Sequence, residues 1–436
     1  MKGKFCFKHL NRFPVLRSMS RRWTGAPPGP VLCVGAAAGP HGLLASGSEG
    51  GAVRVWSQEG LVVGSLSLPR EEDVTSAVFS PTGLLYVAHG ETVSVLDPRS
   101  LKGAVQELRG AGEEEINALA LDESGGLLAL ADDTGAVRVL ELPGGRLNRT
   151  LRRHTNICSS IAFRPHRPNN LVSAGLDMQV MLWSLQKTRP LWTVSLQEGV
   201  EEEEGHQQRA GQLLNPPLAH CVSVATCGNV LACAAEDGRV HLLRVGAGSK
   251  LEQQGALRAH SQGASQAHFL HCLPQPYWLV TGGNDGLVAL WDLSQHPVVA
   301  PQGNAHTRLP GAPRRKAKGR EKVRLQTQAS ATALVKAQLG RKEKTERLLD
   351  KGQRGGEEKR GGEEGEEGER GGEEGDPGSS IEPSPGQEEE QKAGPKVSFS
   401  HGDKVNWICP ALLRGEPSLV VADQSPCLTV YSLAGL

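Results

Sequence analysis

The stretch AVRVWS (52–57) reads as the end of a β-strand, and its fifth residue is the large apolar Trp56. Six further stretches share this form and a large apolar fifth residue: TVSVLD (92–97), AVRVLE (136–141), QVMLWS (179–184), RVHLLR (239–244), LVALWD (287–292) and CLTVYS (427–432). In TVSVLD, for example, Val93 and Val95 share one face of the strand. The chain of 436 residues therefore repeats one strand-forming unit seven times.

Each ending completes a larger unit of four strands. An apolar run and a turn precede it, as in VLACAAEDGR (230–239) and WLVTGGNDGL (278–287), where Asp-Gly favours a tight hairpin. Another short apolar strand lies further upstream, for example CSSIAFR (158–164), and RPLWTVSL (189–196) has the character of a fourth strand in a linker. The gaps after the fourth, fifth and sixth endings are larger, so extra sequence is inserted there.

A unit with four strands, a period of about 40–45 residues and WD-type endings resembles the WD40 repeat. The resemblance implies an all-β fold, a seven-bladed WD40 β-propeller, whose closure removes open strand edges. The last repeat ends at Tyr431-Ser432 with almost nothing after it, so it lacks a fourth strand. We expect MSRRWTG (19–25) to supply that strand and to join the two ends of the chain.

Two repeats carry polar residues at matching positions. The first set is His154, Ser173, Asp177 and Trp183, and the second is His260, Thr281, Asp285 and Trp291. In WD40 proteins this quartet is a buried hydrogen-bond network, so the resemblance implies a structural role. Ser, His and Asp also form hydrolase triads, but no GxSxG elbow accompanies either set. We predict structural networks and no catalytic residues, and expect the repeats with degenerate quartets to depend more on apolar packing.

Asp97-Pro98-Arg99 follows the second strand ending, where Leu96 stands in the usual Trp position. The pattern resembles the WDxR signature of propellers that serve as substrate receptors of cullin-4 ubiquitin ligases. The resemblance implies that Asp97 and Arg99 lie on one rim and contact the ligase adaptor, damage-specific DNA-binding protein 1. An Arg on a turn stiffened by Pro98 suits that contact, because its planar guanidinium makes directed hydrogen bonds. The alternative is an exposed turn pair with no partner.

The segments outside the repeats set the expected domain boundaries. We expect a disordered basic extension (1–18), the closing strand and blades 1–6 with an acidic loop at 198–205 (19–295), a disordered basic-then-acidic insertion (296–400) and blade 7 (401–436). The insertion is predicted to project between the sixth blade and the seventh. The basic extension is compatible with a mitochondrial presequence or with a non-essential segment before an alternative start at Met19.

The basic half of the insertion contains PRRKAKGR (313–320). Its cations are Arg314, Arg315, Lys316, Lys318 and Arg320. They are a possible nuclear-import signal or nucleic-acid patch, and the alternative is a solvated stretch that the acidic half neutralises. The RGG triplets lack the aromatic residues that stack on bases, so we predict no specific nucleic acid as partner. The expected location is cytoplasmic, nuclear or both.

Composition excludes several other classes of protein. The formal net charge is zero, so no global charge favours nucleic acid, and no apolar run approaches the roughly 18–20 residues that span a membrane. The nine cysteines form no CxxC pair and are read as buried free thiols. His268, His271 and Cys272 invite a metal interpretation, but strand positions three apart face opposite sides. We therefore predict neither metal nor cofactor.

The sequence thus predicts a non-catalytic protein-interaction scaffold and not an enzyme. The preferred hypothesis is a substrate receptor of a cullin-4 ubiquitin ligase, docking on damage-specific DNA-binding protein 1 through Asp97 and Arg99. The alternative is a general WD40 scaffold with no ubiquitin-ligase link. Fold alone does not decide between them, because propellers host many functions. The substrate is not identified by the sequence.

Overall fold

Short antiparallel strands form almost all of the regular structure. The computed structural model describes five stretches of the chain: residues 20–25, 29–39, 42–197, 215–299 and 394–436. In these stretches 28 strands form seven sheets of four strands each. The helical elements described are the 3-10 turns η1 (Glu49–Gly51), η2 (Pro69–Glu71) and η3 (Ala247–Ser249), and none of the described helices is long or apolar enough to cross a membrane.

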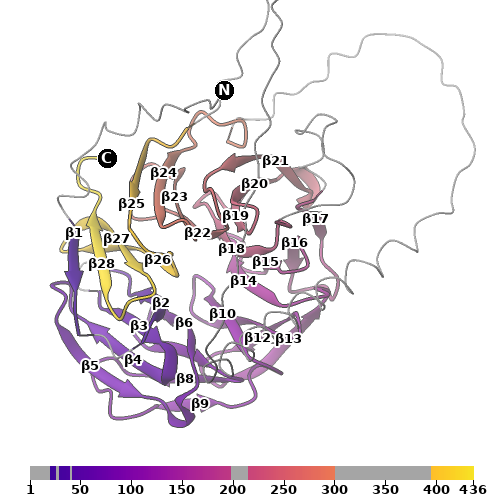
Figure 1. Cartoon of the computed structure of the whole chain (residues 1–436). Coiled ribbons are helices and arrows are strands. Elements are labelled where there is room, and N and C mark those ends of the chain that lie inside the picture. Colours follow the sequence, from indigo (N-terminus) through magenta and orange to yellow (C-terminus); the bar gives the residue numbers. More distant parts are fainter. Residues whose placement is uncertain (1–19, 26–28, 40–41, 198–214, 300–393) are drawn as a thin grey trace, which may run out of the picture. The chain divides into compact units, whose positions relative to one another are not determined.

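The seven sheets are the blades of a β-propeller, and we number them from the first complete sheet along the chain (Figure 1). Blade 1 contains β2 (Val31–Ala36), β3 (Leu44–Ser48), β4 (Ala52–Trp56) and β5 (Val62–Ser67). Blade 2 contains β6 (Val74–Phe79), β7 (Leu85–His89), β8 (Thr92–Leu96) and β9 (Gln106–Leu108). Blade 3 contains β10 (Ile116–Leu121), β11 (Leu127–Asp132), β12 (Ala136–Glu141) and β13 (Arg146–Arg152).

The remaining blades follow the same order, with the last completed from the start of the chain. Blade 4 contains β14 (Cys158–Phe163), β15 (Asn170–Gly175), β16 (Gln179–Ser184) and β17 (Trp192–Ser195). Blade 5 contains β18 (Ala219–Val224), β19 (Val230–Ala235), β20 (Arg239–Val245) and β21 (Leu251–Arg258). Blade 6 contains β22 (Ala264–Phe269), β23 (Trp278–Gly283), β24 (Leu287–Asp292) and β25 (Val397–Ser400). Blade 7 contains β26 (Trp407–Leu413), β27 (Glu416–Ala422), β28 (Leu428–Ser432) and β1 (Ser20–Trp23).

The propeller closes through β1, which pairs antiparallel with β28 and places Trp23 opposite Leu428. Trp23 is buried, and its ring stacks on that of Trp56 in blade 1 with the ring centroids 6.1 Å apart. The first strand of each blade contacts the first strands of both neighbouring blades, and β26 contacts β2. The predicted seven-bladed fold is confirmed, and residues 19–25 include the closing strand as expected.

The hairpin turns between the second and third strands follow the predicted chemistry. Gly238 and Gly286, each after an Asp, have φ of 77° and 69°. Such positive φ angles are easily reached only without a Cβ. The corresponding turn of blade 4 has Met178 at φ 62°, so a non-glycine residue adopts the same conformation there.

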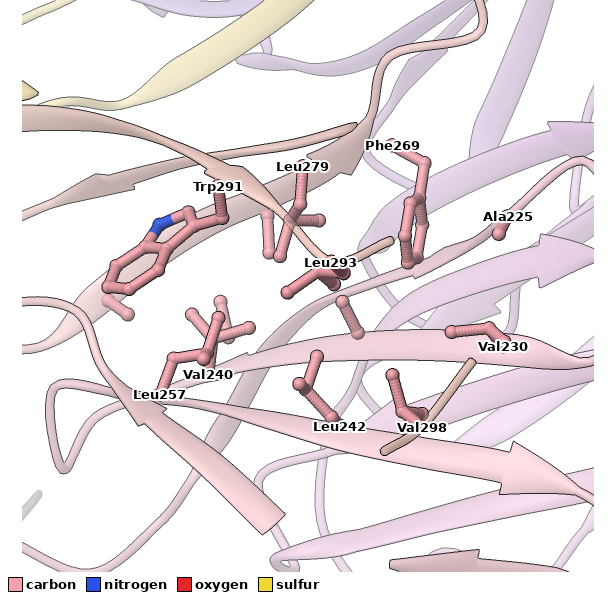
Figure 2. Packing of buried hydrophobic residues seen from close by; sticks show 14 of the residues in the cluster. Ala225, Val230, Val240, Leu242, Leu257, Phe269, Leu279, Trp291, Leu293 and Val298 are labelled. Atoms are coloured by element: carbon pink, nitrogen blue, oxygen red, sulfur yellow. The ribbon is translucent and has the colours of Figure 1, made fainter. Parts of the chain in front are cut away.

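The core lies between the blades and not within them. Seven clusters of buried apolar side chains each combine residues of two neighbouring blades. Figure 2 shows the cluster between blades 5 and 6, where Trp291 and Leu279 of blade 6 lie opposite Val240 and Leu242 of blade 5. Full burial of one such aliphatic side chain contributes about 1.5–3 kcal/mol. The ring is therefore stabilised by burial at every blade-to-blade contact.

Side-chain hydrogen bonds also join the first strands of neighbouring blades. Short polar residues near the start of one first strand donate to the main-chain carbonyl at the start of the next: Thr75 to Ile116, Asn117 to Cys158 (3.4 Å), Ser159 to Ala219 (2.6 Å), Ser265 to Val405 (2.7 Å) and Asn406 to Val31 (3.3 Å). From blade 1 to blade 2 the thiol of Cys33 makes the equivalent contact with the carbonyl of Val74. These bonds add polar contacts between neighbouring blades to the apolar contacts of the core.

The insertion before the last blade does not have the predicted boundaries. Residues 397–400, which we assigned to the insertion, form β25, the fourth strand of blade 6, with Leu287 opposite Ser400. The extra sequence therefore interrupts blade 6 between its third and fourth strands and does not separate blades 6 and 7. Residues 300–393, the acidic loop at 198–205 and the extension 1–18 lie outside the described residues.

Candidate protein-binding rim

The two ends of the propeller carry different kinds of loop. At one end the third strand of each blade passes to the fourth; its described loops are 57–61, 97–105, 142–145, 185–191 and 246–250. We call this end the Arg99 rim. At the opposite end, which we call the quartet rim, the second strand turns into the third and the fourth strand leads to the next blade. His154, Asp177, His260 and Asp285 lie there.

Asp97 and Arg99 face one another on the Arg99 rim. Nε of Arg99 donates to Oδ1 of Asp97 and Nη2 donates to Oδ2, both at 2.9 Å, and the Arg99 main-chain N–H donates to Oδ1 at 3.0 Å. These hydrogen bonds lower the pKa of Asp97, so its carboxylate stays charged. The Arg99 side chain is 77 % exposed and the Asp97 side chain is 25 % exposed. Two parallel hydrogen bonds to the carboxylate thus hold the guanidinium in one orientation at the surface.

The loop that carries Arg99 is anchored on both sides of it. Pro98 is buried and Leu101 is partly buried in the apolar cluster between blades 1 and 2. Leu101 lies so close to β5 that a Cβ added at Gly64 would come within 2.6 Å of its Cδ1 atom. Ser100 N–H donates to the Asp97 carbonyl at 3.0 Å, which closes a turn. Arg99 is thus displayed from a loop whose neighbouring residues are packed.

The quartet of blade 4 is present on the other rim. Nδ1 of His154 lies 2.9 Å from Oδ1 of Asp177, and Nε2 lies 2.8 Å from Oγ of Ser173. The indole N–H of Trp183 donates to the same Ser173 oxygen at 2.8 Å. Because a carboxylate only accepts, a neutral His154 donates from Nδ1 and accepts the Ser173 hydroxyl at Nε2. Every polar atom of the relay then has a partner.

Blade 6 repeats this arrangement with Thr in place of Ser. His260 lies 3.0 Å from both Asp285 and the Thr281 hydroxyl, and Trp291 donates to Thr281 at 3.2 Å. Burial lowers the pKa of His260, while Asp285 opposes that shift. Burial would raise the pKa of Asp285, but main-chain N–H groups, the Ser261 N–H first, and His260 lower it.

The burial of these groups bears on the hydrolase interpretation. Ser173 and Thr281 have no exposed surface, and the His154 and Asp177 side chains are 0 % and 3 % exposed. A nucleophile in that position has no path to a substrate. The quartets stabilise the packing of the loops and are not a reaction centre.

The blades with degenerate quartets, which we expected to depend more on apolar packing, also carry polar contacts of other kinds. In blade 1, Arg54 donates from the third strand to the carbonyl of Gly25, in the segment that enters the blade. In blade 3, Arg138 donates to the carbonyls of Gly110 and Ala111 at 3.0 and 2.7 Å. An Arg on the third strand thus fixes the same incoming loop that the quartet His fixes elsewhere.

Two more blades use histidines in other positions. In blade 2, Nδ1 of His89 lies 3.0 Å from Glu72 and Nε2 lies 2.9 Å from the Ser94 hydroxyl. The order of roles is permuted: the acid is on the incoming loop, the His is at the hairpin and the hydroxyl is on the third strand. In blade 5, His241 on the third strand lies 3.3 Å from Asp237 of the hairpin.

Blade 7 replaces both the strand hydroxyl and the indole of the quartet with one phenol. Nδ1 of His401 lies 2.8 Å from the Tyr431 hydroxyl, and Nε2 lies 2.9 Å from Asp423. Burial alone would raise the pKa of Asp423, but hydrogen bonds from His401 and Ser425 lower it to about 2. The carboxylate therefore stays charged across the physiological range.

A sequence signal marks the blades with substitute ties. The third residue of the strand ending is polar where the quartet is incomplete and apolar where it is complete: Arg54, Ser94, Arg138, His241 and Thr429 against Met181 and Ala289. In blades 1, 2, 3 and 5 that residue makes one of the hydrogen bonds or ion pairs described above. The prediction from the sequence missed these residues because it compared the endings at their fifth position only.

A cavity of about 320 Å³ lies at the centre of the ring, lined by the first strands of several blades. His268 and His271 both line it, although we expected them to face opposite sides, because β22 ends at Phe269 and His271 lies beyond the strand. Burial, followed by the charge of His271, lowers the pKa of His268 to about 4. No group of three or more His, Cys, Asp or Glu side chains in the described stretches is arranged to hold a metal ion.

The geometry defines the fold as a seven-bladed β-propeller. The family described as WD domain, G-beta repeat matches residues 145–184 and 251–292, the two repeats with complete quartets. Among curated proteins, the chain is 26 % identical over 286 residues to the WD repeat-containing protein 53 homolog of Dictyostelium discoideum, covering 61 % of this chain and 76 % of that protein. It is 31 % identical over 144 residues to THO complex subunit 6 of Homo sapiens, covering 31 % of this chain and 42 % of that protein.

Proposed function

We propose that this WD40 scaffold is a substrate receptor of a cullin-4 ubiquitin ligase that docks on damage-specific DNA-binding protein 1 through the Arg99 rim. The observation that supports this most is the exposed Arg99, held in one orientation by two hydrogen bonds to Asp97. An oriented Arg loses little conformational entropy on binding, and Arg is enriched among the residues that dominate interface energies. Substrate would then bind elsewhere on the propeller.

A pull-down of the full chain with purified adaptor tests this proposal. We expect the wild type to bind and Asp97→Ala/Arg99→Ala to lose binding while keeping the melting temperature. Arg109→Ala is the matched control, because Arg109 also pairs with an acid two residues earlier, Glu107, at 2.7 Å and is 81 % exposed. It follows β9 at the opposite end of the same blade, so its loss should leave binding unchanged. Normal binding by the double variant would refute the docking role.

A general scaffold with no ubiquitin-ligase link is the second candidate. The similarity to a protein named as a subunit of the THO complex favours it, since that relative is a component of a larger assembly. Affinity purification of the tagged chain followed by mass spectrometry separates the two candidates. Recovery of one stable assembly without cullin-4 or its adaptor would support the scaffold and contradict the ligase receptor.

Nuclear entry through the basic run stays a prediction, because Arg314, Arg315, Lys316, Lys318 and Arg320 lie outside the described residues. We propose a protein with cytoplasmic and nuclear pools. Imaging of a fluorescent fusion beside a variant with these five residues changed to Ala tests the import signal. An unchanged nuclear fraction in the variant would exclude it.

A further inference from the structure

Arg164 is a buried arginine without an acidic partner. It follows β14 on the Arg99 rim, where the first strand of blade 4 turns into the second, and it is 4 % exposed. Its Nε donates to the Gly228 carbonyl at 2.7 Å, and its Nη2 donates to Oδ1 of Asn229 at 2.8 Å. Both acceptors belong to blade 5 and are uncharged. Among the described residues no carboxylate pairs with Arg164, so its positive charge has no counter-ion.

The exposed arginines show the opposite arrangement. Four arginines that are more than half exposed each pair with an Asp or Glu side chain: Arg99, Arg109, Arg146 and Arg152. A charge in water needs a partner least, whereas a buried charge is costly without one. Burial, followed by the charge of Arg167, lowers the pKa of Arg164, and the group that opposes this shift is the Cys227 thiol and not a carboxylate. The buried guanidinium therefore lies in a site of uncompensated positive charge.

Donors of Arg164 and Arg167 remain available to a ligand. The described residues supply no acceptor for Nη1 of Arg164, and this atom is not among the described side-chain nitrogens that are both unpartnered and closed off from solvent. Arg167 is exposed and donates from Nη1 to the His166 carbonyl at 3.1 Å. Glu123 of blade 3 reaches this turn but engages the main-chain N–H and the ring of His166. Two neighbouring guanidinium groups thus keep N–H donors for an anion.

Four turns of blades 4 and 5 meet around Arg164, and we call them the blade 4–5 corner: 164–169, 185–191, 225–229 and 246–250. Leu185 N–H donates to the Asn169 carbonyl at 2.8 Å, which joins the two turns of blade 4. Val245 N–H, at the end of β20, donates to the Asn229 carbonyl at 2.8 Å, which joins the two turns of blade 5. Arg164 joins the two blades through the Asn229 side chain. The four turns are therefore one connected part of the rim.

The blade 4–5 corner carries charge of one sign. It contains no Asp or Glu, and it has five cations: Arg164, Arg167, Lys187, Arg189 and Lys250. Lys250 is compensated by Glu252 of β21, with Nζ 2.6 Å from Oε1. Charges of one sign that line one region raise the local concentration of a ligand of the opposite sign. The corner therefore favours an anion over a neutral or cationic ligand.

A phosphate group matches this site better than a carboxylate. It carries about 1.5 to 2 negative charges at pH 7 and three acceptor oxygens, enough for two guanidinium groups. The planar fork of an Arg also donates to two phosphate oxygens at once. A nucleic-acid strand fits less well, because bases stack on free aromatic faces. The exposed aromatic beside the corner, Trp192, has Nζ of Lys250 over its ring, 5.8 Å from the centroid.

We propose that Arg164 and Arg167 form a phosphate-binding site, and that its occupant is a phosphorylated side chain of a protein partner. Lys187 and Arg189 of the same corner would attract acidic residues that flank the phosphate. The site lies on blade 4, whereas Arg99 lies on blade 2. The inference therefore goes beyond the proposed function and does not depend on adaptor docking.

Inorganic phosphate titrated into the full chain at constant ionic strength tests the site first. Thermal melts should show a rise in melting temperature that NaCl of the same ionic strength does not produce. Arg167→Ala should weaken the apparent affinity for phosphate at least about fivefold, because one of two guanidinium groups is gone. Arg146→Ala is the matched control, because Arg146 is 77 % exposed on the same rim but already pairs with Glu141. Equal responses of all three proteins would mean a general salt effect and would overturn the site.

Arg164→Gln removes the buried charge itself and should abolish the response to phosphate. This change also removes hydrogen bonds to blade 5, so its melting temperature without phosphate shows whether the variant is folded. A folded Arg164→Gln variant with the wild-type response would overturn the role of Arg164. If the variant does not fold, the exposed Arg167 decides the test.

A peptide array identifies the source of the phosphate. The full chain is applied to random-sequence peptides that carry one phosphoserine and to the same peptides with unmodified serine. We expect binding to phosphorylated peptides alone, and its loss in Arg167→Ala. Tighter binding to a single-stranded RNA oligonucleotide than to any phosphopeptide would assign the phosphate to nucleic acid and overturn the protein partner. A response to inorganic phosphate without binding to any peptide would assign the site to a small molecule and overturn it equally.

Discussion

Blades 4 and 2 have the same strand order but use their polar residues differently. In blade 4, Leu171 lies opposite Trp183, and the Trp, Ser173 and His154 form a relay that ends on the buried Asp177. In blade 2, Leu85 lies opposite Leu96 in the equivalent place. The blade 2 relay runs through His89 instead and ends on Glu72. The same backbone therefore tolerates two sets of hydrogen bonds, provided that the incoming loop is held.

The two relays differ most in the exposure of their acids. Asp177 is 3 % exposed, whereas Glu72 of blade 2 is 31 % exposed. A buried acid that loses its partner keeps a desolvated charge, but an acid at the surface regains water. Blade 2 also ends in the exposed Asp97–Arg99 pair, which has no equivalent in blade 4. The polar groups of the blade 4 relay are buried in the fold, whereas the Asp97–Arg99 pair of blade 2 lies at the surface.

The largest expected effect comes from removing the histidine of each relay. His154→Ala leaves Asp177 buried without its imidazole partner and should lower the free energy of unfolding by about 3–5 kcal/mol. His89→Ala should cost about 1–3 kcal/mol, because Glu72 rehydrates and only the Ser94 hydroxyl loses a buried partner. Urea denaturation of the two variants beside wild type measures the difference. Equal costs would contradict the comparison.

Removing the strand hydroxyl should have a smaller effect. Ser173→Ala deprives both Trp183 and His154 of a partner and should cost about 2–3 kcal/mol. Ser46→Ala in blade 1 is the matched control, since Ser46 accepts only from Trp56, at 2.9 Å, and should cost about 1 kcal/mol. A larger loss in the Ser46 variant, measured by the same denaturation, would show that the His link adds nothing.

The third prediction concerns how the buried Asp423 of blade 7 makes the stability of the fold depend on pH. The folded pKa of Asp423 is about 2, below the unfolded value of about 3.9. The folded state therefore gains stability above pH about 4 and loses it as the pH falls from about 4 to about 2, by at most about 2 kcal/mol. Thermal melts between these pH values should show a weaker acid dependence in Asp423→Asn. An unchanged dependence would assign the acid loss to other groups.

Much of the fold was predictable because one pattern recurs along the chain. The seven strand endings, the Asp-Gly hairpins and the closing segment near Ser20 all follow from repetition, since each blade must bury its faces against two neighbours. The strand at 397–400 was missed because a four-residue strand beyond a long insertion has no periodicity of its own. Local composition assigned it to the insertion, and only pairing with β24 makes it a strand.

The site was predictable where the repeats agree and not where they diverge. The two quartets share the spacing from the hydroxyl to Asp and from Asp to Trp, so each set supported the other. The ties through Arg54 and His89 do not follow the quartet pattern, because these residues lie on the third and the second strand of their blades and not on the incoming loop. Their geometry depends on which atoms the fold brings together, and a single sequence does not show that.

The smallest expected effect is on the stability of the Arg99 rim, and it tests the difference between binding and stabilising residues most directly. Arg99→Ala and the control Arg109→Ala should leave the melting temperature unchanged, because both guanidinium groups are mostly exposed and screened by solvent. Differential scanning fluorimetry at low and at high salt measures both. A clear fall in melting temperature for Arg99→Ala alone would mean that Arg99 orders its own loop. Its effect on adaptor binding would then follow from a disordered rim and not from a lost contact.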